Sequence, residues 1–142
     1  YGIIHFQIKR SRKWSLSRMD PEAEIYIQNL VNQYYRDLST NRQAIAGKYY
    51  DPQARMTYQD SFIHGSQGIH EKLCSLAFQN LQIAVTGMNI QAVMDGKYIV
   101  FVYGQLRDGM DNPMPYSDIF IFASDGQQLR VFNHIFKITT QA

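Results

Sequence analysis

The chain has 142 residues and one cysteine, Cys74, so it fits a single domain and excludes an intrachain disulfide or a zinc site built on several thiolates. No apolar run approaches the ~20 residues of a membrane-spanning helix, and no membrane partner is expected. The net charge of +2 is uneven, since residues 1–18 carry five cations and no carboxylate while residues 19–142 carry 9 basic and 12 acidic side chains. An acidic body argues against a nucleic-acid surface and allows a basic protein partner.

Residues 1–18 form a basic leader with two interpretations. The run Lys9-Arg10-Ser11-Arg12-Lys13 fits a basic arm or a localisation signal. Alternatively the leader is a disordered or non-native extension, with Met19 as the natural start of the chain. We favour the second interpretation, and we treat residues 19–142 as one domain.

Three helices are predicted in the first half of this domain. Asp20 can cap the first, whose apolar stripe runs to Leu38 at three- and four-residue spacing. A capping box at Thr40–Gln43 predicts a short second helix ending near Gly47. Ser66 is the predicted N-cap of a third helix.

Two short strands are expected between the second and third helices, at residues 54–58 and 62–63, joined by a turn at 59–61. Asp51-Pro52 is expected to separate the second helix from the first of these strands.

The stretch Gln79–Ile138 is predicted to form four long strands joined by tight turns. Asp-Gly pairs at 95–96, 108–109 and 125–126 stand between apolar runs, and Gly accepts the positive φ that hairpin turns require. Helices followed by such strands predict an α+β domain. We expect the sheet to wrap around the helices and to leave a pocket between them as the functional site.

Five short runs, taken in order, resemble one known family over most of residues 22–140. They are Gln33-Tyr34-Tyr35, Met56-Thr57-Tyr58, residues 71–79, residues 102–106 and residues 133–137. The family is nuclear transport factor 2. The resemblance implies a cone, in which a strongly bent antiparallel sheet wraps around three N-terminal helices and pairs with a second copy through the sheet.

The resemblance also implies a function. Members of the family carry the GDP-bound form of the small GTPase Ran through nuclear pores and contact phenylalanine-glycine nucleoporins. An apolar cavity admits an aromatic side chain of Ran, and acidic residues on the rim pair with basic residues beside it. The expected protein is therefore a homodimeric carrier of cytoplasm and nucleus, found at the pores of the nuclear envelope, with no enzymatic activity and no cofactor.

On this resemblance, the expected Ran-binding residues fall in two groups. The cavity mouth would be lined by Tyr58, Leu76, Phe78, Leu81, Phe101, Leu106, Ile135 and Phe136. The rim would comprise Gln59, Asp60, Asp108 and Asp111. Gln59 stands where the family has a glutamate, and losing one carboxylate of a desolvated pair can cost ~2–5 kcal/mol of affinity. Tyr26 is the expected nucleoporin contact.

Other interpretations stay open at this stage. Any one of the apolar residues could be ordinary core, and Asp108 and Asp111 suit a hairpin turn by turn chemistry alone. The domain could be a related interaction module, either an mRNA export cofactor or a peptide-binding domain. An enzyme of the scytalone dehydratase or ketosteroid isomerase type is a further alternative, with Tyr58, Asp60 and His134 as its proton-transfer set.

His134 has a simpler interpretation as a satisfied strand histidine. The alternation of residues 131–137 groups it with Phe132 and Phe136 on an aromatic face. We expect that face to lie at the dimer interface rather than in the cavity.

Overall fold

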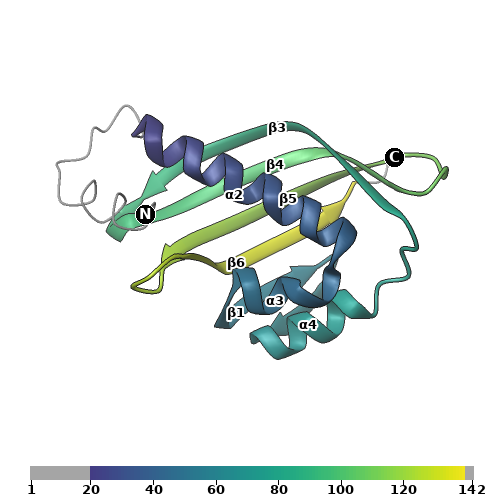
Figure 1. Ribbon diagram of the computed structural model, residues 1–142, viewed down its shortest axis with the longest axis horizontal. Helices are drawn as coiled ribbons and strands as arrows, with labels where there is room; N and C mark the ends of the chain where they lie inside the picture. The colour runs from purple at the N-terminus through teal and green to yellow at the C-terminus, as the bar shows by residue number, and fades with distance from the viewer. Residues whose placement is uncertain (1–19, 140–142) are drawn as a thin grey trace.

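A computed structural model describes residues 20–139 (Figure 1). The basic leader, with both of its interpretations, lies outside the described residues. The helices are α2 (Pro21–Thr40), η1 (Arg42–Ala44), α3 (Ile45–Tyr49), α4 (Ser66–Cys74) and η2 (Met94–Gly96). The strands are β1 (Tyr50–Tyr58), β2 (Ser61–His64), β3 (Leu81–Val93), β4 (Lys97–Asp108), β5 (Met114–Ser124) and β6 (Leu129–Ile138). No helix among residues 20–139 is long and apolar enough to cross a membrane.

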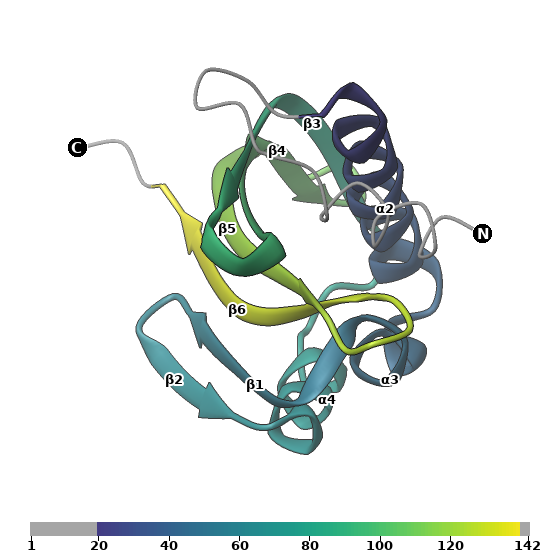
Figure 2. The same cartoon turned by 90° about the vertical axis from the view of Figure 1, so that its left-hand side faces the viewer.

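The six strands form one sheet in the order β2-β1-β6-β5-β4-β3. The sheet curves strongly, and α2, α3 and α4 lie on its concave side (Figures 1 and 2). The α+β prediction with three helices and a bent sheet is therefore confirmed. One pairing differs from the expected antiparallel sheet, because β1 and β6 run parallel.

Helix α2 forms for the reasons that its sequence suggested. The Asp20 carboxylate accepts a hydrogen bond of 3.0 Å from the backbone N–H of Glu22 and caps the helix. Its apolar stripe, which includes Ile27, Val31 and Tyr34, is buried against the sheet. This burial holds the helix along the concave side (Figure 1).

Three predicted element boundaries are wrong. The capping box does not form, because the Thr40 hydroxyl donates back to the carbonyl of Arg36 in the last turn of α2. The N-cap of α4 is Gly65, at a φ of +91°, and Ser66 is the first residue of the helix. Strand β1 begins at Tyr50 and so includes Pro52, which was expected to precede the strand.

The four-stranded meander, β3 to β6, forms most of the sheet. Strands β3 to β6 pair antiparallel in sequence order, and the three Asp-Gly pairs lie at their connections. A bulge interrupts β3 between Val85 and Gly87, opposite Gly104 of β4. Gly104 is required there, because a Cβ at this position would lie 1.9 Å from the carbonyl oxygen of Ala84.

Candidate functional site

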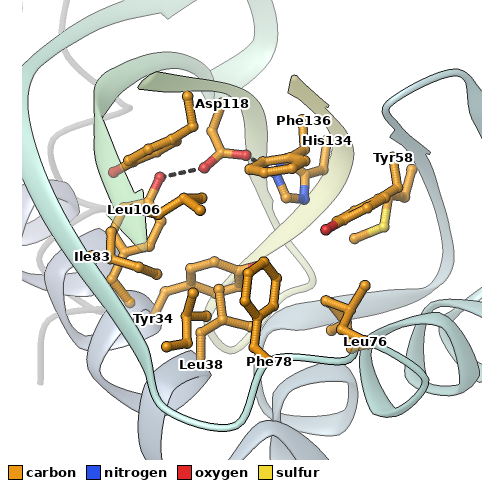
Figure 3. Close-up of a pocket in the computed structure, with 15 residues that line it drawn as sticks. Tyr34, Leu38, Tyr58, Leu76, Phe78, Ile83, Leu106, Asp118, His134 and Phe136 are labelled. Carbon is orange, nitrogen blue, oxygen red and sulfur yellow. Dashed lines mark hydrogen bonds and ion pairs between the residues drawn. The ribbon is translucent and has the colours of Figure 1, made fainter. Parts of the chain in front are cut away.

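An apolar pocket lies between α2 and the concave side of the sheet, where the connection from α4 to β3 crosses it (Figure 3). Its free space is about 30 Å³. The lining residues come from α2, α4, the segment that follows α4, and five strands: Tyr34, Tyr35, Leu38, Met56, Tyr58, Leu73, Leu76, Phe78, Leu81, Ile83, Leu106, Tyr116, Asp118, His134 and Phe136.

Six of the eight residues expected at the mouth line this pocket, and two do not. The six are Tyr58, Leu76, Phe78, Leu81, Leu106 and Phe136. Phe101 and Ile135 lie on the other side of the sheet, where they are 39% and 44% exposed. Their expected place in the cavity is wrong, because each follows a residue that already points inward and successive strand residues point to opposite faces.

The two rim aspartates of the β4–β5 loop have different surroundings. The Asp108 carboxylate accepts backbone N–H bonds from Gln79 and Asn80, at 3.0 and 2.7 Å. Asp111 is exposed, and among residues 20–139 its carboxylate makes no ion pair. Neither side chain lines the pocket itself, but the Gly109 N–H donates to the Asn80 carbonyl and ties this loop to the pocket wall.

The turn after Tyr58 carries the other expected rim residues. Gln59 has a positive φ of 59°, and its side-chain oxygen accepts the backbone N–H of Ile138 at 3.1 Å. Asp60 pairs with the Lys137 ammonium at 2.5 Å. Both polar groups therefore have partners within the chain, and the negative charge of Asp60 is balanced locally.

Tyr26, the expected nucleoporin contact, lies on α2. It is half-buried and packs against the core. Its role in binding stays a prediction.

A buried polar chain closes the base of the pocket (Figure 3). The Asp118 carboxylate accepts the Tyr35 hydroxyl at 2.6 Å and lies 2.5 Å from Nε2 of His134. Nδ1 of His134 lies 2.7 Å from the Tyr50 hydroxyl, which in turn lies 2.9 Å from the Tyr34 hydroxyl. With a neutral imidazole that donates from Nε2, every bond in the chain has one donor and one acceptor.

The tyrosines of this chain are held in their neutral form. Burial raises the pKa of Tyr35 and of Tyr50 well above the ordinary value. Burial raises the pKa of Tyr34 as well, and the nearby Asp118 carboxylate adds to all three shifts. The network therefore binds α2 to the sheet through neutral hydroxyls and one buried carboxylate.

The position of His134 corrects the expectation from the sequence. His134 faces the cavity side, stacks on Phe120 at a ring distance of 4.2 Å, and is 4% exposed, so it is not part of the outer face of the sheet. The alternative proton-transfer set does not assemble either, because the carboxylate beside His134 is Asp118 and not Asp60.

Both ring nitrogens of His134 are engaged by groups of the chain, Nε2 by the Asp118 carboxylate and Nδ1 by the Tyr50 hydroxyl. Among residues 20–139, no cluster of three or more His, Cys, Asp or Glu side chains could hold a metal ion. The pocket is an apolar receptacle whose base is a buried hydrogen-bonded network.

Several residues of the site were not expected from the sequence, among them the lining residues Tyr35, Ile83 and Asp118 and the neighbouring cations Arg42 and Lys72. Asp118 is a single carboxylate in the inward register of Tyr116, Phe120 and Phe122, and that isolated charge was the available signal. Arg42 and Lys72 gave no such signal.

These two cations lie beside the pocket. The Arg42 guanidinium donates to the carbonyls of Leu76 and Phe78, at 3.0 and 2.7 Å. The Lys72 ammonium lies 5.0 Å from the centre of the Tyr58 ring.

Comparison with known proteins gives concordant matches. Residues 26–138, which include every residue of the pocket, match the family model described as nuclear transport factor 2 (NTF2) domain. Nuclear transport factor 2 of Saccharomyces cerevisiae is 34% identical over 117 residues, which cover 81% of this chain and 93% of the yeast protein. The protein of the same name from Neurospora crassa is 36% identical over 110 residues, covering 76% of this chain and 88% of the relative.

A solved structure agrees with these matches. The structure of nuclear transport factor 2 from Cryptosporidium parvum superposes with a TM-score of 0.78 at 30% identity, covering 86% of this chain and 98% of that one.

Proposed function

The chain belongs to the nuclear transport factor 2 family, and on that premise we propose that it is a non-enzymatic import carrier for GDP-bound Ran. An aromatic side chain of Ran would enter the apolar pocket, and a basic residue beside it would pair with Asp108 and Asp111. The observation that carries the proposal is the position of an exposed acidic loop directly beside an apolar pocket. An apolar anchor supplies affinity, and a charged rim supplies register and association rate.

Asp111 is the stronger candidate for the cation contact. Its carboxylate is exposed, whereas that of Asp108 already accepts two backbone N–H bonds. Asp60 already pairs with Lys137, and Gln59 carries no charge, so the opposite side of the rim offers less attraction to a second cation. We therefore expect most of the electrostatic contribution to Ran binding to come from the β4–β5 loop.

The proposal also includes pairing of two copies of the chain and binding to nucleoporins of the nuclear pore. The outer face of the sheet exposes Phe101, Tyr103 and Ile135, an apolar surface that suits a second copy of the chain. Phenylalanine-glycine nucleoporins would bind near Tyr26 on α2. Such a carrier would work in cytoplasm and nucleus and at the pores of the nuclear envelope.

Binding to Ran in its two nucleotide states tests the proposal. Calorimetry with Ran-GDP and Ran-GTP should give measurable binding to the GDP form alone. The Asp111→Lys variant should bind Ran-GDP at least about tenfold more weakly, a loss of about 1.4 kcal/mol or more, and should sediment like the unmodified protein.

A matched charge reversal serves as the control. Glu24→Lys places the same change in the first turn of α2, about three helical turns from Tyr34. It should leave Ran binding unchanged. Equal affinity for both nucleotide forms, or full binding by Asp111→Lys, would contradict the proposed function.

A further inference from the structure

The wall of the pocket consists of helices and strands except at one place. Among the lining residues, only Leu76 and Phe78 lie outside these elements. Both belong to the connecting segment, residues 75–80, which leads from α4 to β3, and both side chains point into the pocket (Figure 3). This segment is the part of the wall whose backbone is not fixed by a helix or by a sheet ladder.

Two charged side chains hold the connecting segment instead. Arg42 of η1 donates from its two terminal nitrogens to the carbonyls of Leu76 and Phe78. Asp108, at the end of β4, accepts the N–H groups of Gln79 and Asn80. Hydrogen bonds to charged groups are stronger than neutral ones, so Arg42 holds the middle of the segment and Asp108 holds its last two residues.

The clamped pocket is too small for an aromatic ring. Its free space of about 30 Å³ holds roughly one water molecule, whereas an apolar protein cavity that takes up benzene measures about 150 Å³. A ring can therefore enter only if part of the wall moves. Moving a strand or α2 would break regular backbone hydrogen bonds and the buried Asp118–His134 network. Moving the connecting segment breaks the contacts of its two clamps, the bond from the Gly109 N–H to the Asn80 carbonyl and the side-chain packing of the segment, but no sheet ladder.

We propose that Arg42 and Asp108 are positioning residues that hold the connecting segment closed over the pocket, and that release of this segment admits the aromatic side chain of the partner. This inference rests on the proposed function and identifies the segment that controls access of the aromatic side chain to the pocket. The apparent dissociation constant of a ligand equals its intrinsic value divided by the fraction of open molecules. Weakening a clamp should therefore strengthen binding.

The Arg42→Ala variant tests the inference, because Arg42 touches the segment and does not line the pocket. Amide hydrogen exchange should become at least about tenfold faster at Gln79 and Asn80 and stay unchanged in β4 and β5. N-acetylphenylalaninamide, followed by NMR, should bind at least about fivefold more tightly, and Ran-GDP should associate faster.

Two further variants make the result specific. Arg36→Ala removes an exposed arginine whose side chain, within the part of the chain that the structure describes, hydrogen-bonds to Gln33 of the same helix, and it should change neither exchange nor binding. Arg42→Lys keeps the charge but cannot donate to both carbonyls from one planar group, and it should give an intermediate effect. It also supplies the test if Arg42→Ala does not fold.

The outcomes separate the two proposals. Faster exchange in Arg42→Ala with unchanged, weaker or undetectable binding of N-acetylphenylalaninamide would overturn the clamp inference, even if Ran-GDP binds the unmodified protein. Tighter binding of that probe to Arg42→Ala, with no binding of Ran-GDP to any variant, would support the clamp and refute the proposed function.

Discussion

At the scale of single residues, the buried pair of Asp118 and His134 decides how the base of the pocket behaves. Both side chains are almost fully buried, and each satisfies the other while also accepting from a tyrosine. A buried network of this kind is stable only when it is complete, since removal of one member leaves a polar group without water or partner. The base of the pocket is therefore held by a complete network in which each polar group has a partner.

His134→Ala should lower the free energy of unfolding by about 3–5 kcal/mol, because it leaves the buried Asp118 carboxylate without its ring N–H. Urea denaturation at neutral pH would measure the loss. His64→Ala, at an exposed position of β2, is the matched control and should stay within about 0.5 kcal/mol. A loss below about 1 kcal/mol for His134→Ala would mean that the pair contributes little to the fold.

The buried tyrosines predict the response to high pH. The folded protein raises the pKa of Tyr34, Tyr35 and Tyr50 above the ordinary value of about 10, so unfolded chains release these protons first. Their contribution to stability is complete below pH 10 and falls as the pH rises above it. The urea midpoint should be flat from pH 8 to 9.5 and decline beyond pH 10. Full ionisation of all tyrosines, seen by phenolate absorbance while the circular dichroism stays native, would refute this account.

At the scale of elements, local patterns could be read from the sequence and long-range pairings could not. The stripe and cap of α2 and the Asp-Gly turns of the meander are local signals, and they predicted those elements correctly. The parallel pairing of β1 with β6 joins residues about 80 positions apart, and no local pattern encodes it.

The face of β6 was misjudged for a specific reason. Ile121 of β5 pairs with Asn133 of β6, and the next residue, Phe122, pairs with Val131. Phe132 is therefore an extra residue of β6 in a bulge. The bulge lets both Val131 and His134 point inward, although strict alternation assigns them to opposite faces. The sequence pattern does not show where a bulge interrupts the alternation of a strand. The face of the sheet to which each residue of β6 points could therefore not be predicted on both sides of the bulge.

Gly104→Ala should destabilise the protein by about 1–3 kcal/mol, because its Cβ would collide with backbone atoms of β3 at the bulge and force the strands apart. Thermal unfolding would register the change. The matched control is Gly47→Ala in α3, where a Cβ meets no atom within 4 Å. Since alanine favours helix, the control should be neutral or slightly stabilising. Equal effects of the two substitutions would show that the β3–β4 contact is not tight.

At the scale of the whole molecule, the two faces of the sheet differ in what they present: one face carries the pocket and the other an exposed apolar surface. The concave face holds the helices and the pocket (Figure 1). The convex face exposes aromatic and aliphatic side chains, among them Phe101, Tyr103 and Ile135, which in a lone chain would contact water. Assembly through the convex face would therefore leave the pocket open on the other side.

On the proposed pairing of two copies, Ile135→Glu should shift the protein from twice the chain mass to the 16.5 kDa of one chain in sedimentation equilibrium, because it places a charge on the apolar convex face. Met94→Glu, at an exposed position in the β3–β4 turn, is the matched control and should leave the mass unchanged. Binding of N-acetylphenylalaninamide should survive in the monomer, because Ile135 lies on the face of the sheet opposite the pocket. Loss of that binding together with the dimer would instead mean that pairing of the sheets holds the pocket in shape.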